Sequence, residues 1–287
     1  MISPEDCRIL GMAPVTGRRR RSSAVSQALR AVVQTDLLAI PLPERGIAAP
    51  FKIRVASTLP LRRRAYALAH RVYQRAGYVS DDGTNLCISP YDAQPQTLTL
   101  LAQDASGNDW ATLSLVFDSE CGLPCDEIYA GEVRSLRDSG CRIAEVTRLA
   151  IDENCSASRE VLLQLFNQCY IFARKVRGCS DLVVEVNPRH ETYYQRMLHF
   201  TRVGPERPCA RVQGAPALLL RLNLAEIELT LKESGGNGRD AEGRRVHAYP
   251  YSKSEERAVA EALARNHRPM SRKEIYYFGL QSRSAVC

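Results

Sequence analysis

Two charged residues interrupt a stretch of the sequence that otherwise has the composition of a buried strand. The stretch is AEVTRLAID, residues 144–152, and its charges are Glu145 and Arg148. Burying a charge is costly unless the charge is paired or used. A carboxylate close to an amine can accept its proton, so Glu145 is a candidate general base. Residues three apart point to opposite faces of a regular strand, so Glu145 and Arg148 would need a bulge to pair.

The hydrophobic pattern around this strand predicts a chain of alternating strands and helices. Strands are expected at 51–57, 97–103, 110–117, 144–152, 181–186, 199–204 and 216–224. Helices are expected at 61–75, 123–140, 158–176 and 187–198, the last with Asn187 as its N-cap. This order predicts an α/β fold (α+β mixed sheet) with helices on both faces.

Two extensions flank the predicted core of residues 51–232. Residues 1–50 contain a run of four arginines and one predicted helix within 22–38. Residues 233–287 begin as a Gly-rich linker and continue with predicted helices near 254–266 and 270–280. We therefore predict an N-terminal basic and helical extension, a central domain, and a linker with a C-terminal helical extension.

The bulk composition favours a cytoplasmic protein with an acidic partner. Hydrophobic residues make up 45% of the chain and the formal net charge is +7. The first residues lack the apolar segment of a secretory signal, and residues 37–42 are too short to cross a bilayer. Cys121 and Cys125 are weak evidence for zinc, because no second pair or His lies nearby, and we predict no metal site.

Four stretches, together with the order of elements, resemble the GNAT acyltransferase superfamily. They are LAHRVYQRAGY at 68–78, SPYD at 89–92, EVTRLAI at 145–151 and NPRHETYYQRMLHF at 187–200. Within that superfamily they look like the long-chain N-acyl amino acid synthases and the acyl-homoserine-lactone autoinducer synthases. The resemblance covers about residues 51–224. It implies a GNAT-like acyltransferase fold and the transfer of a long-chain fatty acyl group to the α-amine of an amino acid, with tyrosine as one candidate.

One departure from the superfamily bears on the acyl donor. GNAT enzymes that use CoA carry a Gly-rich loop after this strand, whose N–H groups hold the pyrophosphate. Here the segment is DENCSASRE, without glycine, and Asp152 and Glu153 would repel a pyrophosphate. The resemblance therefore implies acyl-carrier protein as donor, with its acyl-phosphopantetheine as a co-substrate and no further cofactor.

The resemblance and the chemistry of aminolysis assign roles to individual residues. The catalytic candidates are Glu145 as base, Arg148 as an orienting or carrier-binding group, and Tyr194 as acid for the leaving thiol. The acceptor would be held by Arg71, Tyr73 and Asp92. The acyl and pantetheine slot would be lined by Thr147, Leu149, Ile151, Leu162 and Phe166. Carrier-protein docking would use Arg159, Arg174, Lys175 and Arg177. Core packing is the alternative interpretation of the apolar residues, and a solvated helix face is that of the basic ones.

Two other functions are compatible with the sequence. One is an acyl-homoserine-lactone synthase that uses S-adenosylmethionine. The other is a non-enzymatic GNAT-like module that binds nucleic acid through the arginines at 18–21. We expect no nucleic-acid partner, because both Glu145 and Arg148 are kept; the extensions or the product could bring the protein to a membrane surface.

Overall fold

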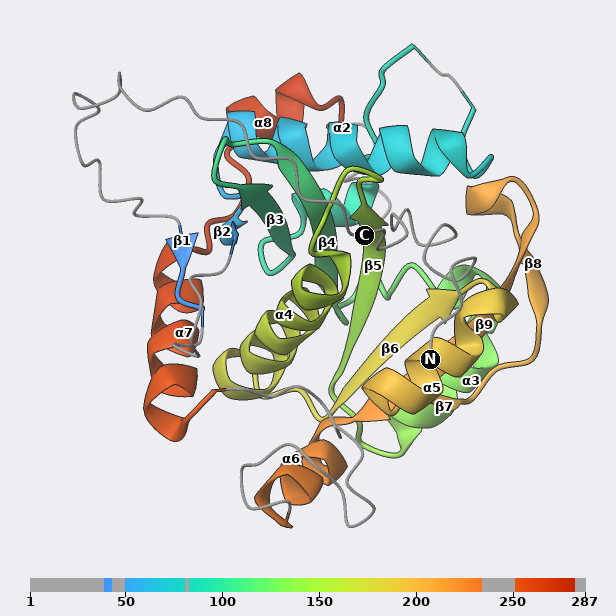
Figure 1. The fold of residues 1–287 in the computed structure, drawn as a ribbon. Coiled ribbons are helices and arrows are strands. Elements are labelled where there is room, and N and C mark those ends of the chain that lie inside the picture. Colours follow the sequence, from blue (N-terminus) through green and yellow to red (C-terminus); the bar gives the residue numbers. More distant parts are fainter. Residues whose placement is uncertain (1–38, 43–49, 81–82, 234–250, 282–287) are drawn as a thin grey trace.

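A mixed β-sheet with helices on both faces forms the centre of the molecule (Figure 1). In this computed structural model, the described residues are 39–42, 50–80, 83–233 and 251–281. The predicted helix within 22–38, the arginine run and most of the 233–243 linker lie outside them. The mixed sheet and the GNAT-like order of strands and helices agree with the fold class that the sequence predicts.

Nine strands build the sheet in the described part of the chain. They are β1 (Ala39–Ile40), β2 (Phe51–Val55), β3 (Leu98–Asp104), β4 (Asp109–Phe117), β5 (Ile143–Ile151), β6 (Asp181–Val186), β7 (Thr201–Arg202), β8 (Arg207–Cys209) and β9 (Ala215–Asn223). The order across the sheet is β1-β2-β3-β4-β5-β6-β9-β7, and β8 pairs with β9 outside this path. Among these pairs only β5 and β6 run parallel.

The helices lie on the two faces and at one end of the sheet. They are α2 (Leu59–Arg75), α3 (Asp126–Asp138), α4 (Ser158–Ile171), α5 (Glu191–Leu198), α6 (Leu224–Glu233), α7 (Lys253–Asn266) and α8 (Arg272–Tyr277). Short helical turns are η1 (Pro90–Ala93), η2 (Phe172–Val176), η3 (Pro188–His190) and η4 (Ala210–Val212). Figure 1 shows α4 and α7 side by side, and α8 beside α2 at the top of the view.

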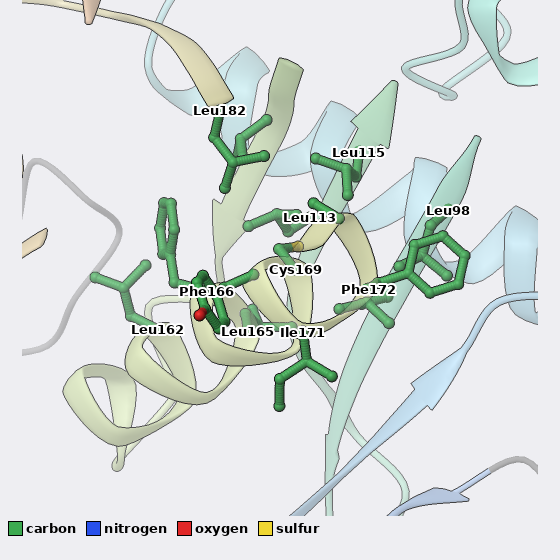
Figure 2. Packing of buried hydrophobic residues seen from close by; sticks show 14 of the residues in the cluster. Leu98, Leu113, Leu115, Leu162, Leu165, Phe166, Cys169, Ile171, Phe172 and Leu182 are labelled. Atoms are coloured by element: carbon green, nitrogen blue, oxygen red, sulfur yellow. The ribbon is translucent and has the colours of Figure 1, made fainter. Parts of the chain in front are cut away.

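Alternate strand residues face the two helical layers. Leu115 packs in the cluster that contains α4, α5 and α7, whereas its neighbour Val116 packs against α3. Likewise Leu100 joins the α4 cluster and Leu101 joins the cluster of α2 and α8. Figure 2 shows the centre of the α4 cluster, where side chains of α4 interdigitate with leucines of the strands. Strands buried on both faces explain why their sequences are nearly continuous apolar runs.

Several boundaries differ from the sequence predictions. The helix predicted at 158–176 is α-helical only to Ile171 and ends in the π-turn η2. Strand β8 and helix α6 were not predicted, because β8 is three residues long and α6 follows β9 without a break. Helix α5 has the expected N-terminal cap, since Asn187 Oδ1 accepts the backbone N–H of Arg189 at 3.2 Å. Its C-cap His199 has a left-handed backbone with φ of 58°.

In the part of the chain that the structure describes, no helix has the length and apolar character needed to cross a membrane.

The C-terminal segment is fastened to α2 by a buried ion pair. Arg62 of α2 donates to Glu274 of α8, and both side chains are nearly inaccessible, at 6% and 5% exposure. Arg62 also donates to the backbone carbonyl of Arg268, whose own guanidinium donates to the carbonyl of Ser57. The described tail helices therefore belong to the same packed unit as the sheet.

We expect Glu274→Ala to lower the free energy of unfolding by about 3–5 kcal/mol, because it leaves the buried Arg62 unpaired. Urea unfolding at pH 7 would measure the change. The matched control is Glu261→Ala on α7, an exposed position, where a change within about 0.5 kcal/mol is expected. Equal effects of the two substitutions would contradict a fastening role for Glu274.

Candidate functional site

A cavity of about 580 Å³ opens where the parallel strands β5 and β6 separate. Its walls come from the second half of β5, the end of β6, the end of α2, residues 78–80 and 86–91, and the β8–β9 connection. The paired register of β5 and β6 runs from Ile143 opposite Asp181 to Val146 opposite Val184. Beyond Val146 the two strands continue without this pairing, and the cavity lies there. Carboxyl ends of neighbouring parallel strands commonly form binding sites in this way.

A β-bulge at Arg148 causes the separation. Thr147 pairs with Ser114 of β4 and Ala150 pairs with Thr112, so two residues of β5 oppose the single residue Leu113. Arg148 itself has φ of 53°, in the left-handed region that a residue with a side chain rarely adopts. The bulge turns Arg148 toward α2, the same helical layer that Glu145 faces.

Arg148 is paired with Asp92 and not with Glu145. Both terminal nitrogens of its guanidinium donate to the two carboxylate oxygens of Asp92. The guanidinium also lies over the ring of Tyr66, 5.3 Å from its centroid. Burial would lower the pKa of Arg148, but Asp92 raises it above its ordinary value, so the cation is retained. Asp92 also accepts the backbone N–H of Ser89 at 2.8 Å, so both of its oxygens are occupied.

Glu145 is buried beside the cavity at 1% exposure. Its Oε2 accepts the backbone N–H of Cys125, the N-cap of α3, at 2.8 Å. Burial, together with the nearby carboxyl group of Glu185, raises the pKa of Glu145 to about 8. This value is suited to accepting a proton from an ammonium group near neutral pH, since proton transfer is efficient when the two pKa values are close.

Glu185 and Arg211 are site residues that the sequence analysis missed. Glu185 is on β6, and Arg211 of η4 donates both to Glu185 and, at 2.7 Å, to Glu127 of α3. All three side chains line the cavity with Glu145. The criterion that singled out Glu145, a charge inside a buried strand, applies equally to Glu185 in DLVVEV and could have found it. Arg211 lies in a turn and carries no comparable sequence signal.

Four further residues with predicted roles line the cavity: Thr147, Leu149, Tyr73 and Tyr194. Tyr194 is buried on α5, and its ring contacts Phe166 and Phe200 edge to face, with centroids 5.8 and 5.6 Å away. Burial raises the pKa of the Tyr194 hydroxyl, so it is protonated at neutral pH. The same holds for Tyr73, whose hydroxyl is also desolvated.

Three residues predicted to line the acyl slot lie instead in the core. Ile151, Leu162 and Phe166 belong to the cluster between the sheet and α4, and none of them lines the cavity. Figure 2 shows Leu162 and Phe166 among the packed side chains of this cluster. The apolar part of the cavity wall is formed by other residues: Val72, Leu86, Ile88, Val146, Val184 and Val186.

Two basic residues near the end of α2 pair with the segment that follows β5. Arg71 donates to Asp152 at 3.0 Å, and Arg75 pairs with Glu153 at 2.8 Å. Arg71 is outside the cavity lining, so its predicted contact with the acceptor carboxylate has no support from its position. Because the two carboxylates are paired, the repulsion expected for a pyrophosphate is weaker than the sequence implied. The lack of glycine in this segment is unaffected.

The four residues predicted to dock a carrier protein lie at two ends of α4. Arg159 is exposed at the start of the helix, at the cavity end of the parallel pair. Arg174, Lys175 and Arg177 follow the helix and directly precede β6, so they lie at the opposite end. Arg174 and Lys175 pair with Glu228 of α6, at 3.3 and 3.1 Å. The guanidinium of Arg177 lies over the rings of Phe117 and Phe172.

Among the described residues, no group of three or more His, Cys, Asp or Glu side chains is arranged to hold a metal ion.

The fold and the site define a class of protein. A mixed sheet with a bulged central strand, a separated parallel pair and a buried strand glutamate at the cavity is a GNAT-like acyltransferase. The family model of the N-acyl amino acid synthase FeeM matches residues 64–223, which is more than half of the chain. The chain belongs to this family and is an acyltransferase.

The solved structure of FeeM, an N-acyl amino acid synthase from uncultured soil microbes, is 26% identical to the chain with a TM-score of 0.56, covering 64% of this chain and 96% of that one. The acyl-homoserine-lactone synthase LasI is 17% identical with a TM-score of 0.48, covering 61% and 90%. A GNAT-family acetyltransferase from Streptococcus pneumoniae is 16% identical with a TM-score of 0.43, covering 60% and 98%. No curated protein matches the chain.

The raised pKa of Glu145 predicts a pH-dependent stability. The folded protein binds the Glu145 proton more tightly than the unfolded chain, whose pKa is the ordinary 4.5. This contribution to stability is complete below pH 4.5 and is lost as the pH rises through about 8. Each unit of pKa difference is worth about 1.4 kcal/mol, so we expect a loss of a few kcal/mol.

Urea unfolding of the wild type and of Glu145→Gln between pH 5 and 8 would measure this loss, and the variant should decline less steeply. Glu160→Gln on the exposed side of α4 is the matched control and should keep the wild-type slope. Parallel curves for all three proteins would show that Glu145 has an ordinary pKa.

Proposed function

We propose that the protein transfers a long-chain fatty acyl group from acyl-carrier protein to the α-amine of an amino acid, giving an N-acyl amino acid. Tyrosine is the acceptor we would test first, on the sequence resemblance. The observation that carries the proposal is the buried carboxyl of Glu145 at the cavity, with a pKa near 8. An amino acid arrives as an ammonium ion, and such a base can remove its proton at neutral pH.

The segment after β5 supports a carrier protein as donor. Residues 152–157 contain no glycine, and Asp152 accepts the backbone N–H of Asn154 at 3.0 Å, so its carboxylate occupies the turn where a pyrophosphate would need free N–H groups. A phosphopantetheine arm carries one phosphate and needs no such turn. The backbone of β5 beyond Val146, without β6 as a partner, is available to the amide groups of this arm.

The cavity has a wall suited to an acyl chain. Apolar side chains of α2, of residues 79 and 86–88 and of the two strands line it, and its volume of about 580 Å³ exceeds what a small acyl group needs. Charged side chains gather near β6 and η4, where the carboxyl group of Glu185 pairs with the guanidinium of Arg211. The charged acceptor would bind at this polar end and the acyl chain along the apolar wall.

The reaction then follows from the residues at the cavity. Glu145 takes a proton from the ammonium group, and the free amine attacks the thioester carbonyl, forming the C–N bond. N–H groups of the bulged strand would stabilise the oxyanion of the tetrahedral intermediate. Collapse of the intermediate breaks the C–S bond, and the leaving thiolate takes a proton from the Tyr194 hydroxyl, which regains one from the nitrogen through solvent.

Replacement of the base is the sharpest test of this mechanism. We expect Glu145→Gln to lower kcat by about 10²–10⁴, with an unchanged circular-dichroism spectrum, because general-base catalysis contributes about that factor. The assay is N-acyl tyrosine formation from palmitoyl-acyl-carrier protein, followed by mass spectrometry, with Glu160→Gln as control. A wild-type rate in Glu145→Gln would exclude Glu145 from the reaction.

The donor and the acceptor can be tested together. Lipid extracts of a bacterial host that expresses the protein should contain a new N-acyl amino acid, identified by mass spectrometry with its head group and chain length. With purified protein, palmitoyl-acyl-carrier protein should be consumed much faster than palmitoyl-CoA at equal concentration. Equal rates with both thioesters would overturn the proposed preference for a carrier protein.

A further inference from the structure

We propose that Glu185 shares one proton with Glu145, so that the two carboxyl groups, held by Arg211, act as a single unit that receives the ammonium group of the acceptor. Glu145 remains the group that takes the proton, and Glu185 is a positioning residue. The inference deepens the proposed function and rests on it for the identity of the acceptor.

The geometry of the parallel strands brings the two carboxyls together. Glu145 of β5 is opposite Val183 of β6, and Glu185 is two residues further along β6. Side chains of residues i and i+2 point to the same face of a strand, and neighbouring strands are about 4.8 Å apart. Glu145 and Glu185 therefore face the same side of the sheet, and their side chains lie within hydrogen-bonding reach.

A proton between the carboxyls is required by their surroundings. The Glu145 side chain is buried, and Oε1 of Glu185 is buried without a donor from any described residue. Two ionised carboxylates in contact would repel one another strongly in such a place. A carboxyl that is protonated can instead donate to its neighbour, which satisfies the buried oxygen of Glu185 and removes the repulsion.

Arg211 determines which carboxyl stays ionised. Its guanidinium donates to Glu185 and to Glu127, whereas the hydrogen bonds described for Glu145 come from the amide and the thiol of Cys125 and from no cation. The cation favours the charged form of Glu185, and the charge of Glu185 in turn favours the protonated form of Glu145. Burial raises the pKa of Glu185 as well, and Arg211 opposes that increase.

Other ionisable side chains around the pair come from three elements. They are Tyr91 of η1, Cys125 and Tyr129 at α3, and Cys209 of β8. Burial raises the pKa of each of these groups, and one or both of the two glutamates add to the increase. These groups stay protonated and uncharged over the pH range in which the pair titrates, so their own titration does not change the charge around the two carboxyls.

The pair is suited to an amino acid as acceptor. With one proton it carries a net charge of −1, which attracts an ammonium ion. An isolated glutamate has a pKa of 4.5, several units below that of an α-ammonium group in water, so proton transfer to it is unfavourable. Once the pair has lost its shared proton, transfer from the ammonium group breaks one N–H bond and forms one O–H bond on Glu145, which restores the net charge of −1.

Carbon-13 NMR of protein labelled at the glutamate carboxyls tests the proposal without any substrate. Glu145, assigned by loss of its signal in Glu145→Gln, should titrate near pH 8 in the wild type. In Glu185→Gln its midpoint should fall by at least about one unit, because a like charge has been removed. In Arg211→Gln it should rise, since the opposing cation is lost.

Glu127→Gln is the matched control, because Glu127 contacts the same arginine but is 46% exposed and makes no contact with Glu145 that is described. The Glu145 midpoint should change there by less than about half a unit. An unchanged midpoint in Glu185→Gln, or a wild-type midpoint near 4.5, would overturn the proposal. If Glu185→Gln does not fold, Arg211→Gln carries the test, and a Glu145 midpoint that does not rise in that variant would overturn the proposal.

The pH profile of N-acyl tyrosine formation then separates this inference from the proposed function. The acidic limb of kcat/KM should move to lower pH in Glu185→Gln by the same amount as the NMR midpoint. An NMR shift without any N-acyl amino acid from the wild type would sustain the carboxyl pair and reject the proposed function. Product formation by the wild type, together with an unshifted Glu145 midpoint in Glu185→Gln, would support the proposed function and reject the carboxyl pair.

Discussion

The buried ion pair between Arg148 and Asp92 is the contact on which the cavity depends. A left-handed backbone at a residue with a side chain costs about 1–3 kcal/mol unless the surroundings over-determine it. The surroundings of Arg148 meet this condition, because its guanidinium donates two hydrogen bonds to Asp92 and lies over the ring of Tyr66. The bulge that results shifts the second half of β5 away from β6. The cavity and a set of strand amides without a partner on β6 follow from this one distortion.

The charges near the cavity are almost all compensated within the protein. Arg148 is neutralised by Asp92, Arg71 by Asp152, and Arg211 by carboxylates on two different elements. Arginines paired in this way orient and polarise their neighbours more than they attract ligands. The carboxyl pair on β5 and β6 keeps a net negative charge, so we infer that it binds the charged acceptor.

The sequence predicted the elements well and the site only in part. Periodicity located the strands and helices because both faces of the sheet are covered, so each element has a strong apolar pattern. It also located Glu145, since a carboxylate in a buried strand is conspicuous. The partners of the charges could not be predicted in the same way. Asp92 is 56 residues from Arg148 in the chain, and the bulge that joins them depends on pairing with β4. The apolar residues of the cavity wall were the least well predicted, because a leucine that lines a cavity and a leucine in the core look the same in a sequence. Leu162, for example, packs in the core.

The extent of the family match and the extent of the folded unit are not the same. The match covers residues 64–223, yet Ile40, Phe51 and Leu263 belong to the same apolar cluster as the strands within it. Helix α8, beyond residue 223, closes over α2, and the far end of α2 forms a wall of the cavity. A chain shortened to the matched region would expose one edge of the sheet and an apolar face of α4. The family match thus marks the part of this protein that resembles the family model, whereas the packed apolar core also includes residues on either side of that part.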